Sequence, residues 1–250
     1  MFYGVIVAIY KMFSIYPDVV FGKGGYASFP TILAARILRI PVIIHESDSV
    51  PGRVNKWAGH FAKKVAISFQ ESAEYFSKDK VAWIGQPIRV EIEKPSAREE
   101  AFKYFKLESS LPVVVILGGA LGAELINNTI LDALPRLVKN FQIIHQTGVS
   151  NYKNISERAE VVLDSIPEKA RYKSFAFLNP LSMKMAGGAA SLIVSRAGSG
   201  LFEIAAWEIP SILIPITLSN GDHQRKNAFN YAHTGACDVV EEMNMTANIL

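Results

Sequence analysis

The chain has 250 residues, of which 50% are hydrophobic and 20% are charged, and its formal net charge is +3. This length accommodates one large or two moderate domains with an ample core. A net charge this small gives no support for nucleic acid as a partner. The single cysteine, Cys237, excludes an internal disulfide and is typical of a protein from a reducing compartment.

Residues 1–16 are almost entirely apolar or aromatic, and Lys11 is their one charged side chain. They lack the basic N-terminal region and the small-residue cleavage site of a signal peptide. The apolar run is also too short to predict a membrane span. Two interpretations remain: a helix buried in the core, or a helix whose apolar face lies on a membrane surface.

Short apolar runs alternate with helix-like segments along the rest of the chain. Such strands are typical of parallel sheets covered by helices on both faces, so we predict an α/β fold. A polar stretch at residues 91–100 predicts two domains, 1–90 and 91–250, with a cleft between them. The predicted strands cover residues 19–21, 41–45, 64–68, 81–84, 112–117, 141–145, 174–177, 192–195, 211–214 and 238–240, and the predicted helices cover residues 30–38, 54–62, 71–76 and 123–139.

Three glycine-rich turns, at residues 22–26, 118–123 and 197–201, each follow a predicted strand and precede a helix. Amides at a helix N-terminus suit a phosphate, although glycine also serves close packing of helix on strand. The third turn is the strongest signal, because Glu203 and the polar run 222–227 accompany it. A carboxylate there suits sugar hydroxyls, so this region predicts a nucleotide diphosphate-sugar site. No turn has the spacing of a Walker loop or of a full dinucleotide fingerprint.

Other polar residues allow a structural and a functional interpretation. His45 and Glu46 end a predicted buried strand, and they either stabilise the core or line a polar pocket. Arg89 forms an interdomain ion pair or contacts a diphosphate, which suits its planar guanidinium. His223 and Gln224 either bind sugar hydroxyls or cap the helix that follows them. No His, Cys or carboxylate spacing predicts a metal site.

Several short blocks occur in a fixed order: 17–20, 24–26, 45–46, 55–57, 87–89, 118–123, 196–198, 203–206, 223–224 and 227–228. In order and spacing they resemble the MurG family of bacterial transferases, in glycosyltransferase family 28, over essentially the whole chain. This resemblance implies a GT-B fold, in which two Rossmann-like domains face a cleft. It implies inverting transfer of N-acetylglucosamine from UDP-N-acetylglucosamine to the C4 hydroxyl of undecaprenyl-diphosphate-linked muramoyl-pentapeptide, in peptidoglycan synthesis. It also implies a peripheral enzyme on the cytoplasmic face of the plasma membrane, with no cofactor and no metal.

The resemblance also assigns candidate residues. Glu203 would hold the ribose hydroxyls, and His223 with Gln224 would contact the sugar. Arg89 would lie near the nucleotide, and the backbone near Leu178 would meet the uracil. The remaining donor-side candidates are Ala120, where many relatives have serine, and the amides of Ser199, Gly200 and Leu201. The candidates on the acceptor side are Gly24, Gly25, Tyr26, His45, Glu46, Asp48 and Asn55.

The family begins with a strand and a glycine-rich loop whose histidine is a candidate general base, and this sequence contains neither. We therefore expect an N-terminal domain that is incomplete, a chain truncated at both ends, and a catalytic base that lies outside it. The alternatives are an inactive fragment that only binds the UDP-sugar, and a related GT-B glycolipid transferase or epimerase. A dinucleotide-dependent oxidoreductase would need the acidic residue and full fingerprint that are missing here.

Overall fold

The computed structural model describes residues 2–119, 121–217 and 219–249. Contacts divide the chain into two compact units, of residues 1–87 with 218–227 and of residues 88–217 with 228–250. Contacts thus group residues 218–227 with the first unit, whereas the sequence analysis assigned them to the second domain. The boundary predicted after residue 90 stays a prediction.

The first unit is built on a four-stranded parallel sheet in the order β1-β2-β3-β4. Parallel pairing brings the carboxyl ends of the strands to one edge, where ligands bind in folds of this kind. One cluster of buried residues, which includes Ile32, Ile44 and Val65, joins the helices to the sheet. The elements are α1 (Phe2–Ile15), β1 (Val20–Gly22), α2 (Phe29–Ile37), β2 (Val42–Glu46), α3 (Arg53–Gly59), β3 (Lys64–Ile67) and β4 (Val81–Trp83).

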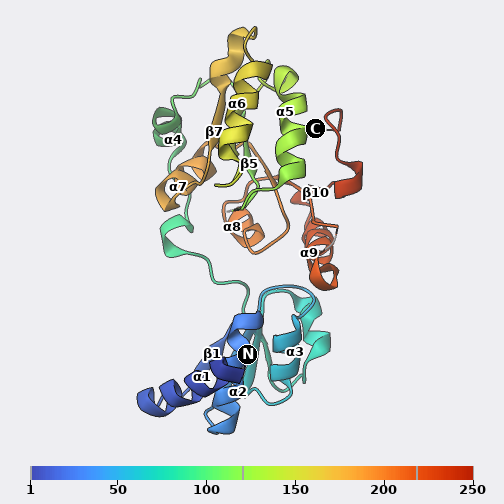
Figure 1. The fold of residues 1–250 in the computed structure, drawn as a ribbon. Coiled ribbons are helices and arrows are strands. Elements are labelled where there is room, and N and C mark those ends of the chain that lie inside the picture. The colour runs from blue at the N-terminus through green and yellow to red at the C-terminus, as the bar shows by residue number, and fades with distance from the viewer. Residues whose placement is uncertain (1, 120, 218, 250) are drawn as a thin grey trace. The chain divides into compact units, whose positions relative to one another are not determined.

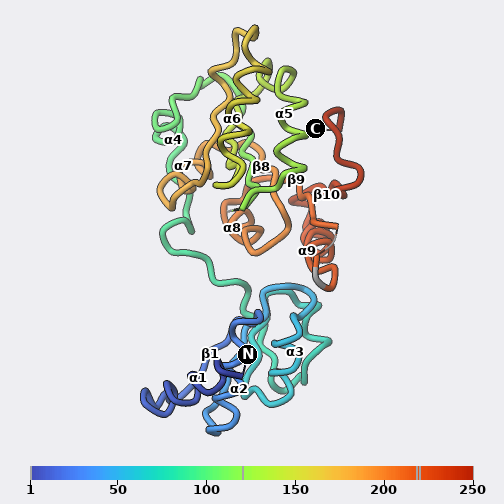
Figure 2. The backbone as a smooth tube through the Cα atoms, in the orientation of Figure 1, coloured from blue at the N-terminus to red at the C-terminus, as the bar shows by residue number. Residues whose placement is uncertain are grey.

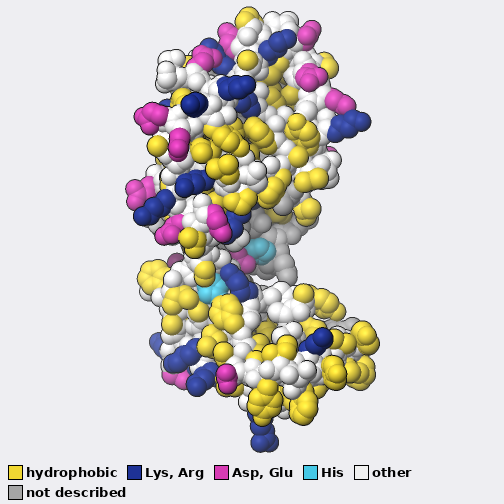
Figure 3. Space-filling view, turned by 90° about the vertical axis from the view of Figure 1, so that its left-hand side faces the viewer, with side chains coloured by type: hydrophobic (Ala, Val, Ile, Leu, Met, Phe, Trp, Pro, Cys, Tyr) yellow, Lys and Arg dark blue, Asp and Glu magenta, His cyan; other side chains and the backbone are white. Residues whose placement is uncertain are grey.

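Helix α1 turns most of its surface away from this core. Its one buried residue is Met12, whereas Phe2, Tyr3, Tyr10 and Phe13 are each at least 70% exposed. Hydrophobic side chains accordingly gather on the surface of this unit (Figure 3). The interpretation of α1 as a buried helix is therefore wrong for the described residues. Among them, no helix is long and apolar enough to cross a bilayer.

The second unit contains a six-stranded parallel sheet in the order β10-β9-β8-β5-β6-β7. From β5 the chain continues through β6 to β7, and it then returns to β8, which pairs with the other side of β5. The order of the strands therefore reverses between β5 and β8, and sheets of this kind bind ligands at such a switch point. The strands are β5 (Val113–Leu117), β6 (Gln142–Gln146), β7 (Tyr172–Phe175), β8 (Leu192–Ser195), β9 (Ser211–Leu213) and β10 (Cys237–Val239), and the helices are α4 (Arg98–Phe105), α5 (Glu124–Leu137), α6 (Tyr152–Val162), α7 (Pro180–Ala189) and α8 (Leu201–Ala206). Helix α9 (His223–Ala232) begins in the first unit, which contains its residues 223–227, and ends in the second.

Alternate residues of the central strands face two separate clusters of the core. Val113 and Val115 of β5 pack with residues of α4, α7 and α8, whereas Ile116 packs with residues of α5 and α6. Figures 1 and 2 show α5 and α6 side by side. The sheet is therefore covered by helices on both faces, which confirms the predicted α/β class with parallel sheets.

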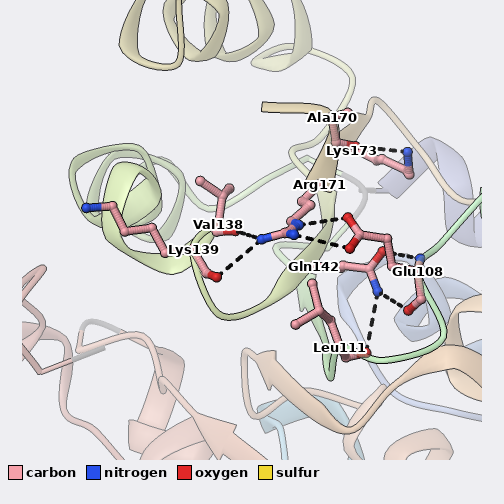
Figure 4. Close-up of polar contacts among 8 residues, drawn as sticks. All are labelled: Glu108, Leu111, Val138, Lys139, Gln142, Ala170, Arg171 and Lys173. Atoms are coloured by element: carbon pink, nitrogen blue, oxygen red, sulfur yellow. Dashed lines mark hydrogen bonds and ion pairs between the residues drawn. The ribbon is translucent and has the colours of Figure 1, made fainter. Parts of the chain in front are cut away.

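An ion pair holds the amino-terminal ends of β6 and β7. The guanidinium of Arg171 donates from Nε to Oε1 of Glu108 at 2.8 Å and from Nη2 to Oε2 at 3.1 Å (Figure 4). Its Nη1 donates to the carbonyls of Val138 and Lys139, just beyond α5. Gln142 of β6 completes the cluster, because its side chain bonds the backbone N–H and C=O of Glu108. Arg171 therefore stabilises the carbonyls just beyond the C-terminal end of α5 and fixes the start of the strands.

Every predicted strand is present, and all but one of them begin and end within one residue of the predicted bounds. The strand predicted at residues 174–177 is β7, at Tyr172–Phe175. The segment predicted as a helix at residues 71–76 is a 3-10 helix, Gln70–Tyr75. Both differences fall at short elements with little apolar periodicity, where sequence patterns are weakest.

Candidate functional site

The turn after β8 is an exposed, glycine-containing surface at the carboxyl end of the larger sheet. Ser199 and Gly200 are exposed, and the amide of Leu201 donates to the carbonyl of Gly198 at 3.0 Å. A Cβ atom at Gly198 or Gly200 would meet nothing within 4 Å, and neither residue has a positive φ. Packing and backbone conformation therefore do not require glycine here. The absence of side chains instead leaves the backbone open to close approach by a ligand.

Glu203 lies on the first turn of α8 and pairs with Arg89. Nε and Nη2 of Arg89 donate to the same carboxylate oxygen, Oε1, at 3.2 and 3.1 Å. The second oxygen, Oε2, lies outside this ion pair. Both residues belong to the second unit, so the structure gives Arg89 a partner on the predicted donor side. A carboxylate held by one oxygen can accept hydrogen bonds from hydroxyl groups with the other.

A second ion pair fixes the backbone beside this turn. Arg196, at the carboxyl end of β8, donates to Oε1 of Glu242 at 2.6 Å and to the carbonyl of Ile214 at 3.0 Å. The other oxygen of Glu242 accepts from the amide of Thr217. Burial alone would raise the pKa of Glu242, but the bonds from Thr217 and Arg196 outweigh it and lower that pKa. The segments that follow β8 and β9 are thus held together by charge-assisted hydrogen bonds.

The segment predicted to meet uracil is fixed by the end of β6. Leu178 is fully buried, and its amide donates to Oε1 of Gln146 at 2.9 Å. Phe177, the residue before it, is 50% exposed. The Leu178 amide is therefore already bonded, so a base bound here would use the neighbouring backbone. The sequence analysis did not single out Gln146, whose place at the end of an apolar strand was the only available signal.

A buried polar chain lies behind the glycine-rich turn that follows β5. His145 bonds Tyr172 through Nδ1 and Asn127 through Nε2, each at 3.0 Å, and Asn127 donates to the carbonyl of Thr147 at 2.9 Å. Burial lowers the pKa of His145 to about 3, so this ring is neutral. Since Asn127 donates through Nδ2, its Oδ1 accepts from His145 Nε2–H, and the Tyr172 hydroxyl then donates to Nδ1.

Gly122 belongs to that turn, and the packing around it requires a residue without a side chain. Its φ is +81°, and an added Cβ would lie 2.1 Å from the carbonyl oxygen of Thr147. Leu121 beside it is 83% exposed. Ala120, a predicted donor-side residue, lies outside the described residues. This turn differs from the one after β8, because a structural reason accounts for its glycine.

In the first unit, Glu46 organises the loop that follows β2. Its Oε1 accepts from the amide of Asp48 at 3.0 Å, and its Oε2 accepts from Gly52 N and Asn55 Nδ2 at 3.2 and 2.9 Å. Burial raises the pKa of Glu46, and these hydrogen bonds oppose the shift. Asn55 also donates to the carbonyl of His45. Glu46 and Asn55 thus hold residues 47–52 in one conformation.

His45 is fully buried at the same strand end. Its Nε2 lies 2.9 Å from the carbonyl of Gly85, so this nitrogen carries the proton and Nδ1 carries the lone pair. Burial lowers the pKa of His45, with a further decrease from the charge of Lys23, so the ring is neutral near pH 7. Nδ1 has no hydrogen-bond partner among the described residues. A neutral imidazole with such a nitrogen can accept a proton or a hydrogen bond.

The turn after β1 lies against Asn55. Gly24 has a φ of +77°, and an added Cβ would lie 2.7 Å from Asn55 Nδ2. Gly25 also has a positive φ, and Tyr26 is 73% exposed. Gly24 contacts Asn55, which in turn bonds His45 and Glu46, so the structure brings these predicted acceptor-side residues together. Tyr26 projects into solvent at the end of the same turn.

The start of α9 is the least expected part of this unit. His223 and Gln224 are half-buried on its first turn, and the Gln224 amide donates to Oγ of Ser219 at 3.3 Å. Ser219 therefore caps the helix. One turn later, the side chain of Asn227 reaches the loop after β2, where Oδ1 accepts from both N and Oγ of Ser49 at 2.8 Å. No pattern in the sequence indicated this contact, beyond the presence of Asn227 in the ordered blocks.

The predicted residues thus form two groups. Arg89, Leu178, Ser199, Gly200, Leu201 and Glu203 belong to the second unit. Gly24, Gly25, Tyr26, His45, Glu46, Asp48, Asn55, His223 and Gln224 belong to the first. Within the described part of the chain, no group of three or more His, Cys, Asp or Glu side chains could hold a metal ion.

Comparison with known proteins assigns the family. The model of the glycosyltransferase family 28 N-terminal domain matches residues 2–67, and that of the C-terminal domain matches residues 113–250. The chain belongs to glycosyltransferase family 28. The two matched regions contain the turn after β1 and the end of β2 in the first unit, and the turn after β8 with Glu203 in the second.

Curated relatives are UDP-N-acetylglucosamine–N-acetylmuramyl-(pentapeptide) pyrophosphoryl-undecaprenol N-acetylglucosamine transferases. One from Bacillus thuringiensis (strain Al Hakam) is 36% identical over 250 residues, which covers 99% of this chain and 67% of the relative. One from Thermodesulfovibrio yellowstonii is 40% identical over 245 residues, which covers 94% of this chain and 63% of the relative. The chain therefore spans about two thirds of the length of these curated relatives.

Solved structures show the same fold. Acinetobacter baumannii MurG aligns with a TM-score of 0.73 at 27% identity, over 98% of this chain and 67% of that one. UDP-GlcNAc 2-epimerase from Neisseria meningitidis, bound to UDP-GlcNAc, aligns with a TM-score of 0.68 at 15% identity, over 98% of this chain and 71% of that one. At that identity the epimerase shares the fold alone. The GT-B class predicted from the sequence is confirmed, and nothing supports the alternative functions.

Proposed function

We propose that this protein transfers N-acetylglucosamine from UDP-N-acetylglucosamine to the C4 hydroxyl of undecaprenyl-diphosphate-linked muramoyl-pentapeptide. Curated relatives that are 34–40% identical to this chain over the aligned residues carry the name of that transferase. The observation that carries the proposal is the exposed turn at Ser199 and Gly200 with Glu203 one turn later, because it combines amides for a diphosphate with a carboxylate for sugar hydroxyls.

On the donor side, Glu203 would accept hydrogen bonds from the ribose hydroxyls. Its Oε2 lies outside the ion pair with Arg89, so a ribose can bind without first breaking that pair. The guanidinium of Arg89 orients the carboxylate, and is itself 46% exposed and able to contact a nucleotide. His223 and Gln224 would contact the N-acetylglucosamine.

The reaction would be a single displacement with inversion at the anomeric carbon. The acceptor hydroxyl attacks that carbon, a base takes the hydroxyl proton, and UDP leaves. The backbone amides near Ser199 and Gly200 would stabilise the negative charge that develops on the departing diphosphate. Fixed amide dipoles suit this task because they need no reorganisation as the bond breaks. We assign no residue of this chain as the general base.

On the acceptor side, Gly24, Gly25 and Tyr26 would line the site, together with Asp48 and Asn55. His45 and Glu46 are buried, so they would act from beneath the surface by holding this loop and Asn55 in place.

Helix α1 would dock the protein on the cytoplasmic face of the plasma membrane, as a peripheral protein. Its exposed aromatic and aliphatic residues, among them Phe2, Tyr10 and Phe13, suit the boundary between headgroups and acyl chains. The acceptor substrate is lipid-linked, so such docking would bring the acceptor side to its substrate. Sedimentation with lipid vesicles tests this, since the variant Phe13→Ser should bind vesicles less and keep its melting temperature.

The proposed activity is tested by supplying radiolabelled UDP-N-acetylglucosamine and undecaprenyl-diphosphate-muramoyl-pentapeptide to the full-length product of the gene. We expect labelled lipid with a β-linked sugar at C4, and one UDP released for each sugar transferred. A folded protein that binds the nucleotide sugar and transfers it to no lipid acceptor would overturn the proposal.

A further inference from the structure

The side chain of Asn227 makes three hydrogen bonds with the loop that follows β2. Its Oδ1 accepts from the backbone N and from Oγ of Ser49, both at 2.8 Å, and its Nδ2 donates to Oδ1 of Asp48 at 2.9 Å. Asn227 is 1% exposed and Ser49 is 3% exposed. Hydrogen bonds this buried and this short hold their partners in one geometry.

The loop that receives Asn227 is itself rigidly held. Asp48 donates its amide to Oε1 of Glu46, and the other carboxylate oxygen of Glu46 accepts from Asn55 and from the amide of Gly52. Asn227 therefore rests on a fixed support within its own unit, which contains both the loop and residues 218–227. Any movement of the first turns of α9 would have to break this network.

Asn227 also lies one helical turn after His223 and Gln224. In an α-helix, residues three and four positions apart lie on the same face. Because Asn227 is fixed to Asp48 and Ser49, the orientation of the first turn of α9 is fixed with it. Ser219 caps that turn from the other end, through the amide of Gln224.

We propose that Asn227 is a positioning residue, which through Asp48 and Ser49 sets His223 and Gln224 for recognition of the transferred sugar. The proposal rests on the proposed function, which gives those two residues their role. It also predicts that the loop after β2, on the acceptor side, and the sugar-binding turn of α9 move as one body. Recognition of the transferred sugar would then depend on a contact that does not itself touch that sugar.

The pair Asn227 and Asp48 offers a specific test, because its donor and acceptor can be exchanged. Asn227→Asp removes the Nδ2 donor and puts two carboxylates face to face, while it keeps an acceptor for Ser49. Adding Asp48→Asn restores one amide donor and one carboxylate acceptor across the same gap. Asn230→Asp is the matched control, since it adds the same charge three residues later on the same helix, where that side chain is half-buried.

Two affinities are measured by calorimetric titration of the full-length gene product, one for UDP and one for UDP-N-acetylglucosamine. For Asn227→Asp we expect a loss of about tenfold or more in affinity for UDP-N-acetylglucosamine, since buried charge-assisted bonds contribute on this scale. The affinity for UDP should stay within about twofold, because the nucleotide is proposed to bind the second unit. The exchanged pair should regain most of the lost affinity, and Asn230→Asp should bind both ligands as the wild type does.

Equal losses for UDP and UDP-N-acetylglucosamine would overturn the proposal, since they would indicate general damage. A failure of the exchanged pair to recover its affinity for UDP-N-acetylglucosamine, in protein with the wild-type melting temperature, would overturn the proposal as well.

If Asn227→Asp does not fold, Ser49→Ala removes one of the three bonds and should give a smaller loss of affinity, again for UDP-N-acetylglucosamine and not for UDP. If the wild type binds UDP-N-acetylglucosamine and Asn227→Asp binds it equally well, the positioning role fails and the proposed function stands. If the wild type does not bind it, the proposed function fails.

Discussion

Two arginine–glutamate pairs of the second unit use the same chemistry in different ways. Arg171 contacts both carboxylate oxygens of Glu108 and two backbone carbonyls as well. Arg89 places two nitrogens on the single oxygen Oε1 of Glu203. The first pair lies where β6 and β7 begin, and the second lies beyond the end of β8. A pair in which both carboxylate oxygens accept from the arginine, here called a saturated pair, can only stabilise the structure. A pair in which one carboxylate oxygen lies outside the ion pair can also accept a hydrogen bond from a ligand.

The largest expected effect comes from removing the charge of Glu203. Glu203→Gln keeps the size of the side chain but weakens the proposed bonds to both ribose hydroxyls and the ion pair with Arg89. Since a hydrogen bond to a charged group contributes about 1.5–3 kcal/mol, we expect kcat/KM for UDP-N-acetylglucosamine to fall at least about 30-fold. Steady-state kinetics at saturating acceptor measure this. A fall of less than threefold would place the ribose elsewhere.

Gly122 and Gly200 allow the same comparison between a residue required for stability and a residue proposed to lie at a ligand. Gly122→Ala would force a methyl group to within 2.1 Å of the Thr147 carbonyl at a φ of +81°, so we expect the free energy of unfolding to fall by about 2 kcal/mol or more. Gly200→Ala meets nothing within 4 Å, so its stability should match the wild type. Its affinity for UDP should nevertheless fall about tenfold, because the methyl group occupies the surface proposed for the diphosphate.

Denaturant unfolding and titration with UDP separate these two outcomes. Gly198→Ala, two residues earlier in the same turn, should behave as Gly200→Ala does. If Gly200→Ala binds UDP as tightly as the wild type, the turn after β8 is not the phosphate site. If Gly122→Ala unfolds at the same denaturant concentration as the wild type, the packing argument for that glycine is wrong.

The next effect is a pH dependence of stability that arises at His145. Its pKa is about 3 in the folded protein and near 6.5 when unfolded, so the unfolded state binds more protons between these values. The free energy of unfolding should therefore decrease as the pH falls below 6.5, by about 2 kcal/mol at pH 5. Denaturant unfolding at pH 7.5 and pH 5 measures the change. The exposed His60 provides the control His60→Gln, which should keep the decrease, whereas His145→Gln should lose most of it.

The smallest expected effect comes from Glu108→Gln, at the saturated pair. Glu108 is exposed and the pair lies at the amino-terminal end of the strands, so a small decrease in melting temperature is expected. The side-chain amide retains one oxygen for Arg171, which limits the loss. KM for UDP-N-acetylglucosamine should not change. A change in KM as large as that for Glu203→Gln would erase the distinction between the two pairs.

The sequence predicted the parts of the fold that depend on local patterns. Apolar runs such as residues 112–117 are buried strands because both faces of a covered parallel sheet are apolar. Helix α7 was not among the predicted helices, and it contains Gly187 and Gly188, a residue type that disfavours a helix. Tertiary packing explains them: a Cβ at Gly187 would lie 3.0 Å from the ring of Trp207, and one at Gly188 would lie 2.3 Å from the carbonyl of Ser96.

The candidate site was predictable only in part. Glu203 follows its glycine turn within a few residues, so spacing alone indicated a carboxylate beside amides. The bonds from Asn227 to Ser49 join residues 178 positions apart, and no local pattern predicts such a contact. The partner of Arg89 could not be chosen from the sequence either, because it lies 114 positions away. The sequence therefore indicated which residues to examine, and the fold supplied their partners.

The most direct test of this account is a calorimetric titration of UDP-N-acetylglucosamine into three proteins, the wild type, Glu203→Gln and Glu108→Gln. If the carboxyl end of β8 binds the nucleotide sugar, Glu203→Gln should bind it at least about 30-fold more weakly, and Glu108→Gln should bind it as the wild type does. Equal affinities for all three proteins, or no binding by the folded wild type, would contradict the account.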